Sequence, residues 1–299
     1  MLGLFSAWIK RRFSREGNAS EHLSKSNLRP GNAKTSIKQD ELQRDKFVKN
    51  LSNVVRTYGK SDSIPIGLYG PWGCGKSSLL NFVMEDLKQD KDTIAIVRFN
   101  PWNFSQGEKL VSNFFSTLSA LIKRSDKSRK AKKAAALLDG FSALAAPAAL
   151  YPGLDVISKT FSRLADTAKD YASAFNDLEN AKDDISNILV KSSKRYVIVI
   201  DDIDRLVDSE IRLIFQLVKS MADFKNIVYI MAFERAVVSR ALDEITNGQG
   251  NRYLEKIIGA WDLSLPPEWR YGGAGAARRC PTSRSMSAKL SPMKAVITL

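Results

Sequence analysis

The sequence contains very little cysteine and histidine for a chain of 299 residues. Only two cysteines, Cys74 and Cys280, and one histidine, His22, are present. Two cysteines are too few for a disulfide scaffold, and they suit a reducing cytosol. The single histidine lies in a polar segment, which excludes a catalytic or metal centre built on histidine.

A hydrophobic run long enough to cross a membrane is missing as well. A spanning helix needs about 20 apolar residues, whereas the apolar stretch from Gly140 to Leu154 is shorter and is broken by Pro147 and Pro152. Two roles stay open for this stretch, a buried or partner-facing loop and a membrane contact. Residues 1–13 form an amphipathic pattern followed by basic residues, which suits an interfacial or a packed terminal helix but no standard signal peptide.

Acidic residues are outnumbered by basic ones. The chain has 32 Asp and Glu against 46 Lys and Arg, a formal net charge of +14. Much of the excess lies near the N-terminus, in Lys123 to Lys133 and after Arg270. Such a balance attracts nucleic acid or anionic lipid, although charge alone carries no specificity. The basic run beside the apolar stretch suits an anionic membrane surface.

Glycine is concentrated in one short segment. Residues 70–77 read Gly-Pro-Trp-Gly-Cys-Gly-Lys-Ser and satisfy G-x-x-x-x-G-K-[ST], the pattern of a phosphate-binding loop that opens a helix. A strand pattern precedes the loop and a helix pattern follows it, as such a loop requires. Glycines let the backbone fold tightly, so that successive N–H groups face the phosphates. The candidate nucleotide-binding residues are Gly70, Pro71, Trp72, Gly73, Cys74, Gly75, Lys76, Ser77 and Ser78.

A phosphate loop needs an acidic partner for its metal ion. Residues 196–200 are apolar without alternation, which is typical of a central parallel strand buried on both faces. Ligands bind at the carboxyl ends of such strands, so Asp201 is predicted to hold Mg²⁺ together with Ser77. Asp202 is predicted to orient or deprotonate the attacking water. Capping of the next helix is the alternative role for the acids here, and it stays open for Asp204 or Asp208.

The rest of the chain predicts a doubly wound parallel α/β fold. Strand patterns recur at residues 93–99 and 226–233, and a strand between the loop unit and the acidic strand suggests the additional-strand class of P-loop proteins. Between them, a long helix is expected after Ser105, where a capping box begins. A 3-4 repeat from Phe161 to Leu189 predicts a second long helix. We expect the two helices to pair antiparallel as a long helical hairpin, with the apolar stretch at its tip.

The ordered set of motifs resembles the KAP P-loop NTPases of bacteria. The motifs that carry the resemblance are Gly67 to Lys76, Asp201 to Arg205, Asp40-x-Leu42-x-Arg44, Phe99-Asn100-Pro101-Trp102, Tyr253 to Ile258 and Leu265-Pro266-Pro267. The resemblance implies ATP as the nucleotide and a link to membranes and phage exclusion. The catalytic residues that it and the loop chemistry suggest are Lys76, Asp202, Glu234 and Arg205.

Three features depart from the family pattern. Glu234 stands where the family has an Asp at the tip of a strand, so its sensor role is an expectation only. The usual pair of membrane helices is reduced to one short apolar stretch. The family is also typically longer at its C-terminus, so the chain is expected to be truncated there.

Five segments are predicted along the chain. Residues 1–38 form a basic N-terminal segment and linker, 39–104 the first part of the NTPase domain, 105–192 the helical insertion, 193–268 the second part, and 269–299 a tail that is expected to be disordered because it lacks acids and apolar periodicity.

The predicted function is Mg²⁺-dependent ATP binding and hydrolysis, coupled to a conformational change at a membrane surface or a partner. The alternatives are a non-hydrolysing ATP-dependent scaffold and a nucleic-acid clamp. Expected partners besides the nucleotide are an anionic membrane surface, and a protein or a second copy bound through the insertion. We expect a cytoplasmic location, with peripheral association at the inner membrane as the alternative.

Overall fold

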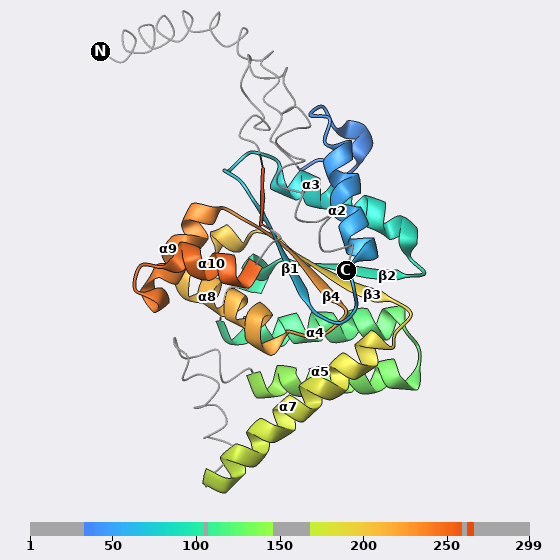
Figure 1. The fold of residues 1–299 in the computed structure, drawn as a ribbon, viewed down its shortest axis with the longest axis vertical. Helices are drawn as coiled ribbons and strands as arrows, with labels where there is room; N and C mark the ends of the chain where they lie inside the picture. Colours follow the sequence, from blue (N-terminus) through green and yellow to red (C-terminus); the bar gives the residue numbers. More distant parts are fainter. Residues whose placement is uncertain (1–32, 105–106, 146–167, 259–261, 266–299) are drawn as a thin grey trace, which may run out of the picture. The chain divides into compact units, whose positions relative to one another are not determined.

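The computed structural model describes residues 33–104, 107–145, 168–258 and 262–265. The fold described here belongs to the unit that begins at Lys34. Its centre is a five-stranded, all-parallel sheet in the order β2-β3-β4-β1-β5 (Figure 1). The strands are β1 (Ile64–Tyr69), β2 (Ile94–Phe99), β3 (Arg195–Ile200), β4 (Ile227–Phe233) and β5 (Asp262–Ser264).

The strand order confirms the predicted fold class. β4 lies between the loop strand β1 and the acidic strand β3, with Ile66 opposite Ile230 and Ile198 opposite Tyr229. The additional strand is therefore β4, which follows both motifs in the sequence. The strand that lies between them in the sequence, β2, is at the edge of the sheet.

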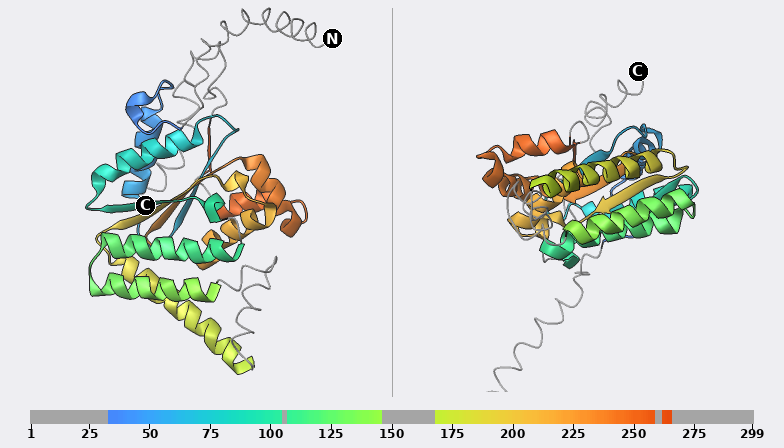
Figure 2. Two further views of the ribbon diagram at one scale, coloured as in Figure 1. Left: turned by 180° about the vertical axis from the view of Figure 1, so that it is seen from behind. Right: turned by 90° about the horizontal axis from the view of Figure 1, so that it is seen from below.

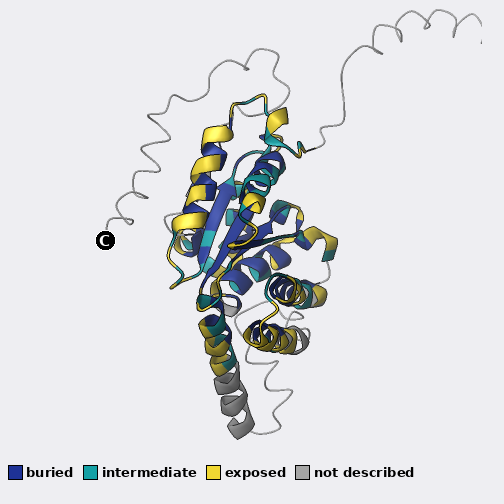
Figure 3. Cartoon of the chain, turned by 90° about the vertical axis from the view of Figure 1, so that its right-hand side faces the viewer, coloured by how far each residue is buried: buried dark blue, intermediate teal, exposed yellow. Residues whose placement is uncertain are grey.

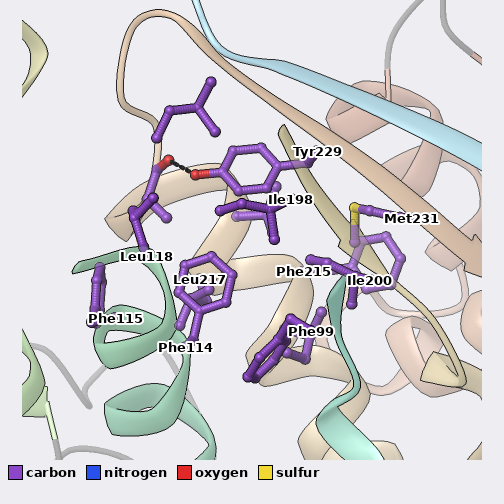
Figure 4. Packing of buried hydrophobic residues seen from close by; sticks show 14 of the residues in the cluster. Phe99, Phe114, Phe115, Leu118, Ile198, Ile200, Phe215, Leu217, Tyr229 and Met231 are labelled. Atoms are coloured by element: carbon purple, nitrogen blue, oxygen red, sulfur yellow. Dashed lines mark hydrogen bonds between the residues drawn. The ribbon is translucent and has the colours of Figure 1, made fainter. Parts of the chain in front are cut away.

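Residues of the central strands alternate between two hydrophobic cores. Successive side chains of a strand point to opposite faces, so Ile198 and Ile200 join one cluster while Val197 and Val199 join the other. Figure 4 shows part of the first cluster, in which the Tyr229 hydroxyl donates to the carbonyl of Ala222 at 2.5 Å. Burial on both faces explains the unbroken apolar runs of these strands.

Helices cover both faces of the sheet, as the doubly wound prediction requires. α2 (Asp45–Thr57) and α3 (Lys76–Leu87) pack on one face. The strands are buried, whereas the outer sides of the helices are exposed (Figure 3). The helices of the other core are α4 (Gly107–Ser125), α5 (Arg129–Ala145), α7 (Ala168–Val190), α8 (Asp208–Gln216), α9 (Arg235–Thr246) and α10 (Gly250–Ile258).

Short helical turns connect several of these elements. They are η1 (Ile37–Gln39), η2 (Lys88–Asp90), η3 (Pro101–Phe104), η5 (Ile203–Arg205) and the π-helical η6 (Leu217–Met221).

The predicted pairing of the two long helices was wrong. α4 packs along α5, and α7 packs against α5 (Figure 2). The reason is a tight turn inside the basic run, where the backbone N–H of Ser128 bonds to Asp126 at 2.8 Å and the Ser128 hydroxyl accepts from Ala131 N–H at 3.1 Å. This turn ends α4 and starts α5, so the helical hairpin is α4–α5.

Several expectations fall outside the described residues. They concern the N-terminal segment before Ala33, most of the apolar stretch, the start of the 3-4 repeat and the C-terminal tail. Within the described ranges, none of the helices is both long enough and apolar enough to cross a bilayer.

Candidate nucleotide-binding site

The phosphate loop joins the end of β1 to the start of α3. Gly73 and Gly75 have φ angles of 80° and 83°, a left-handed conformation that glycine adopts without strain. α3 begins directly at Lys76, so the unpaired N–H groups of its first turn face the loop. The local sequence thus folds into the strand, loop and helix of an anion-binding site.

A buried ion pair lies against the loop. A Cβ atom added to Gly75 would come within 2.6 Å of the Arg44 guanidinium, which is fully buried and lies 4.9 Å from the ring centroid of Phe82. Its Nε donates to Asp40 Oδ1 at 2.8 Å. Sequence reasoning found Asp40 and Arg44 only as part of a family motif and missed this contact with the loop.

The predicted metal ligands lie together. Asp201, at the end of β3, is 5% exposed, and the Ser77 hydroxyl lies close enough to its carboxylate to affect its pKa. Burial, followed by the charge of Asp202, raises the pKa of Asp201, while the charge of Arg98 and the polar interaction with Ser77 oppose this shift. A buried carboxylate next to a hydroxyl offers a cation two adjacent oxygen ligands.

These oxygens fit Mg²⁺. No group of three or more His, Cys, Asp or Glu residues able to hold a metal occurs in the part of the chain that the structure describes. Magnesium in phosphate-handling sites is usually held by one or two protein oxygens together with substrate phosphates. The donor set of Ser77 and Asp201 therefore suits a magnesium ion that arrives with a nucleotide.

Asp202 contacts the turn that follows β2 and the guanidinium of Arg205. Its φ angle is 59°, and its carboxylate accepts from Asn100 Nδ2 at 2.8 Å and pairs with Arg205 Nε at 2.7 Å. Asn100 follows β2, so the two carboxyl-end turns of β2 and β3 meet at Asp202. Sequence reasoning did not assign Asn100 a role at the site.

Asp204 contacts the loop instead. Its Oδ2 lies 3.6 Å from Lys76 Nζ and accepts from the indole N–H of Trp72 at 3.0 Å. Lys76 Nζ also donates to the carbonyl of Gly70 at 2.9 Å. Of the two acids for which helix capping was left open, Asp204 contacts the loop and Asp208 lies in the first turn of α8, whose N-cap residue is Val207.

Arg205 lies between two tryptophans. Its guanidinium carbon is 6.0 Å from the Trp72 ring centroid and 6.0 Å from that of Trp102. Both indoles are largely exposed, at 63% and 49%. The predicted catalytic arginine is therefore held at the rim of the loop by cation–π contacts and by Asp202.

Two predicted nucleotide-binding side chains have other partners. Cys74 is fully buried in the core beneath the loop, so only its backbone is placed to face a phosphate. The Ser78 hydroxyl accepts from the backbone N–H of Lys34 at 3.0 Å. Asn81 Nδ2 donates to the carbonyl of Lys34 at 2.7 Å, so the segment before η1 lies along α3.

Glu234 is the N-cap residue of α9, at the end of β4. Its neighbour Arg235 donates to the Tyr69 hydroxyl at 3.0 Å and pairs with Glu255 at 2.6 Å. Arg235 thus ties the residue before the loop to α10. The sensor role of Glu234 stays a prediction.

A parallel sheet with an additional strand, a glycine loop before a helix, and a buried acid beside the loop serine define the chain as a P-loop domain. It belongs to the KAP family, because the model "KAP family P-loop domain" matches residues 44–270, more than half of the chain. Family membership and the loop together support nucleotide binding at this site.

The chain is also similar to a curated protein, the phage T7 exclusion protein of Escherichia coli (strain K12). The two are 25% identical over 250 residues, which cover 74% of this chain and 33% of that protein. The chain therefore spans about a third of the length of this relative.

Two solved structures of Aeropyrum pernix proteins are similar to the chain. The ORC1 protein in complex with DNA has a TM-score of 0.36 and 12% identity, covering 85% of this chain and 49% of that one. The ORC2 protein in ADPNP-ADP complexes has a TM-score of 0.34 and 16% identity, covering 75% and 48%.

Proposed function

We propose that this domain binds ATP with Mg²⁺ at the loop and hydrolyses it. The observation that carries the proposal is the loop serine, Ser77, beside the buried carboxylate of Asp201 at the end of β3. Ser77 lies in the first turn of α3, directly after Lys76. Phosphoryl transfer requires mainly positioning and charge stabilisation, and this arrangement offers both.

Each residue has a separate task. The loop amides and Lys76 hold the phosphates, and Ser77 and Asp201 hold Mg²⁺. Bound magnesium neutralises charge on the phosphates. Asp202 orients the attacking water and accepts its proton. Asn100 fixes the direction of the Asp202 carboxylate, and Arg205 is placed at the rim to stabilise charge that develops on the transferred phosphate.

Hydrolysis would be coupled to the α4–α5 hairpin through the end of β2. Asn100 contacts Asp202 and is followed by η3, which leads into α4. Phe99 stacks on Phe104 with centroids 5.8 Å apart and meets Phe114 of α4 edge-on at 5.3 Å. A shift of Asn100 on nucleotide turnover would therefore move a packed aromatic cluster at the base of the hairpin.

The exposed basic turn of this hairpin is the proposed contact with an anionic membrane surface. Its side chains at Lys127, Arg129 and Lys130 are all exposed. Similarity to the phage T7 exclusion protein makes phage exclusion the proposed biological setting. A scaffold that binds ATP without hydrolysing it, and a nucleic-acid clamp, are the competing functions.

Phosphate release from Mg-ATP tests the proposal. The wild-type domain should turn over, and Asp202→Asn should lower kcat by roughly 10²- to 10⁴-fold while ATP stays bound. Asp208→Asn, an exposed acid in the first turn of α8, is the matched control and should leave turnover unchanged. ATP binding without any turnover would favour the scaffold.

The partner is tested by adding vesicles or DNA to the phosphate-release assay and by measuring vesicle binding. The domain should bind vesicles of anionic lipid, and this binding should weaken as the salt concentration rises. A triple charge reversal at Lys127, Arg129 and Lys130 should abolish it. Stimulation by DNA alone would favour the nucleic-acid clamp, and equal binding to neutral vesicles would contradict the electrostatic contact.

A further inference from the structure

We propose that Asp204 is a positioning residue that binds Lys76 and Trp72 in competition with the phosphates of a nucleotide, which displace it. This inference rests on the proposed function, because it assumes that phosphates bind at the loop. Asp204 then has a role separate from those of Asp201 and Asp202, because it sets the affinity of the site for the nucleotide.

The contacts of Asp204 join two parts of the site. Its Oδ2 atom accepts from Trp72 Nε1 at 3.0 Å and lies 3.6 Å from Lys76 Nζ. Trp72 and Lys76 belong to the loop, whereas Asp204 lies in η5, after β3. The Asp204 side chain is 5% exposed and that of Lys76 is 11% exposed, so water screens the pair only weakly.

The two partners of Lys76 differ in charge. An ammonium group carries three donors, and the other acceptor of Lys76 is the neutral carbonyl of Gly70. Asp204 therefore supplies the negative charge that a phosphate would otherwise bring to Lys76. A phosphate arriving at Lys76 would face the Asp204 carboxylate across a few ångströms in a poorly screened site, where like charges repel strongly.

The consequence is a competition that lowers nucleotide affinity. The net free energy of binding is the difference between the contacts that the ligand makes and the contacts that it replaces. Removing the charge of Asp204 while keeping its shape should therefore tighten binding. This expectation is the opposite of what is predicted for the loss of a residue that holds the nucleotide.

Trp72 should report the exchange. Its indole N–H bonds to Asp204, and its ring lies against Arg205, which in turn pairs with Asp202. When a phosphate takes Lys76 and repels the carboxylate, the acceptor of the indole N–H moves. The Trp72 environment therefore changes on binding.

Calorimetric titration with ADP in the presence of EDTA measures the displacement of Asp204 by phosphates without a contribution from magnesium binding or hydrolysis. Asp204→Asn keeps an oxygen for the Trp72 N–H, and it should bind ADP on the order of tenfold more tightly than the wild type. Asp208→Asn removes the same charge from an exposed position of α8 and should match the wild type. Asp204→Ala, with its folding checked by circular dichroism, should tighten binding in the same direction.

Tryptophan fluorescence gives an independent readout. The Trp72 contribution, taken as the difference between wild type and Trp72→Phe, should change on addition of ADP. A purely structural role of Asp204 would alter the melting temperature without tightening ADP binding.

Three results would overturn the inference. If the wild type binds ADP and the folded Asp204→Asn variant binds it equally or more weakly, Asp204 does not compete with the phosphates. The proposed function would not be affected by that result. An unchanged Trp72 signal in the ADP-bound wild type would show that the bond to Asp204 persists. If neither folded protein bound ADP or ATP under any condition, the proposed function itself would fail, and the inference with it.

Discussion

The loop end of the sheet and the α4–α5–α7 helices contain ion pairs of nearly the same length in very different surroundings. Arg44 Nη2 lies 2.8 Å from Asp40 Oδ1, and the two side chains are 0% and 4% exposed. Lys133 Nζ lies 2.7 Å from Asp184 Oδ2, with exposures of 61% and 52%. The distance between the charged atoms therefore does not show how much each pair matters for stability. Burial does, because a charge that is out of contact with water is strongly destabilising once its partner is removed.

The difference in side-chain exposure shows in which region of the chain charged groups are buried, at a cost in stability. Around the loop, the side chains of Asp40, Arg44 and Asp201 are buried and fix the backbone that would face a phosphate. In the helical layer, the charges lie on the surface and leave the core between the helices apolar. Substitutions in the two regions should therefore differ in size, and the following predictions are ordered by the effect expected.

The largest loss of stability is expected for Asp40→Ala. The substitution leaves the Arg44 guanidinium buried without this carboxylate, which typically costs about 3–5 kcal/mol. Unfolding in urea should show this drop. Asp45→Ala, which removes a half-exposed acid at the start of α2, is the matched control and should cost less than about 1 kcal/mol. Equal losses for both would break the comparison between the buried and exposed pairs.

A smaller effect of opposite sign is expected for Asp201→Asn. The raised pKa means that the folded protein holds this proton more tightly than the unfolded chain does. Stability is therefore lost as pH rises from the ordinary value of 3.8 through the folded pKa. Without nucleotide, the Asn variant should melt above the wild type at pH 8, with a smaller difference at pH 4. A wild type that melts higher at pH 8 would contradict the burial cost.

The smallest effect is expected for Lys133→Ala. Its pair with Asp184 is exposed to solvent and screened by salt, so its loss should cost less than about 1 kcal/mol. The residual effect should vanish in 1 M sodium chloride. A loss that matches that of Asp40→Ala would mean that the helical layer depends on this ion pair.

Much of the site could be predicted because its signals are local. The loop pattern fixes the turn and the helix start, and an apolar run that ends in acids marks a strand whose carboxyl end lies at the site. The rule that ligands bind at that end then places Asp201 beside Ser77. No knowledge of side-chain packing was needed for this pair.

The remaining contacts depend on how distant segments pack. Which acid meets Lys76 is decided by the left-handed turn at Asp202, which sends its own side chain to Asn100 and brings Asp204 to the loop. The position of Arg44 beneath Gly75 depends on the docking of α2. Neither has a spacing in the sequence that reveals it.

The mistaken helix pairing had a signal that could have been found. The run from Lys123 to Lys133 has the composition of one basic segment, yet it contains Asp126 and Ser128, which end one helix and cap the next. Ala131, Ala134 and Leu138 then repeat at helical spacing and are buried. Lysine is common both in helices and in exposed turns, so the lysines of this run do not show where α4 ends and α5 begins.

Titration calorimetry of Mg-ATP with wild type and Lys76→Ala tests the central claim most directly, that the loop holds the phosphates. Lys88→Ala, an exposed lysine that follows α3, is the matched control. The wild type and the control should bind alike, whereas Lys76→Ala should lose about 100-fold or more in affinity with an unchanged circular dichroism spectrum. A folded Lys76→Ala variant that binds Mg-ATP as tightly as the wild type would contradict the account.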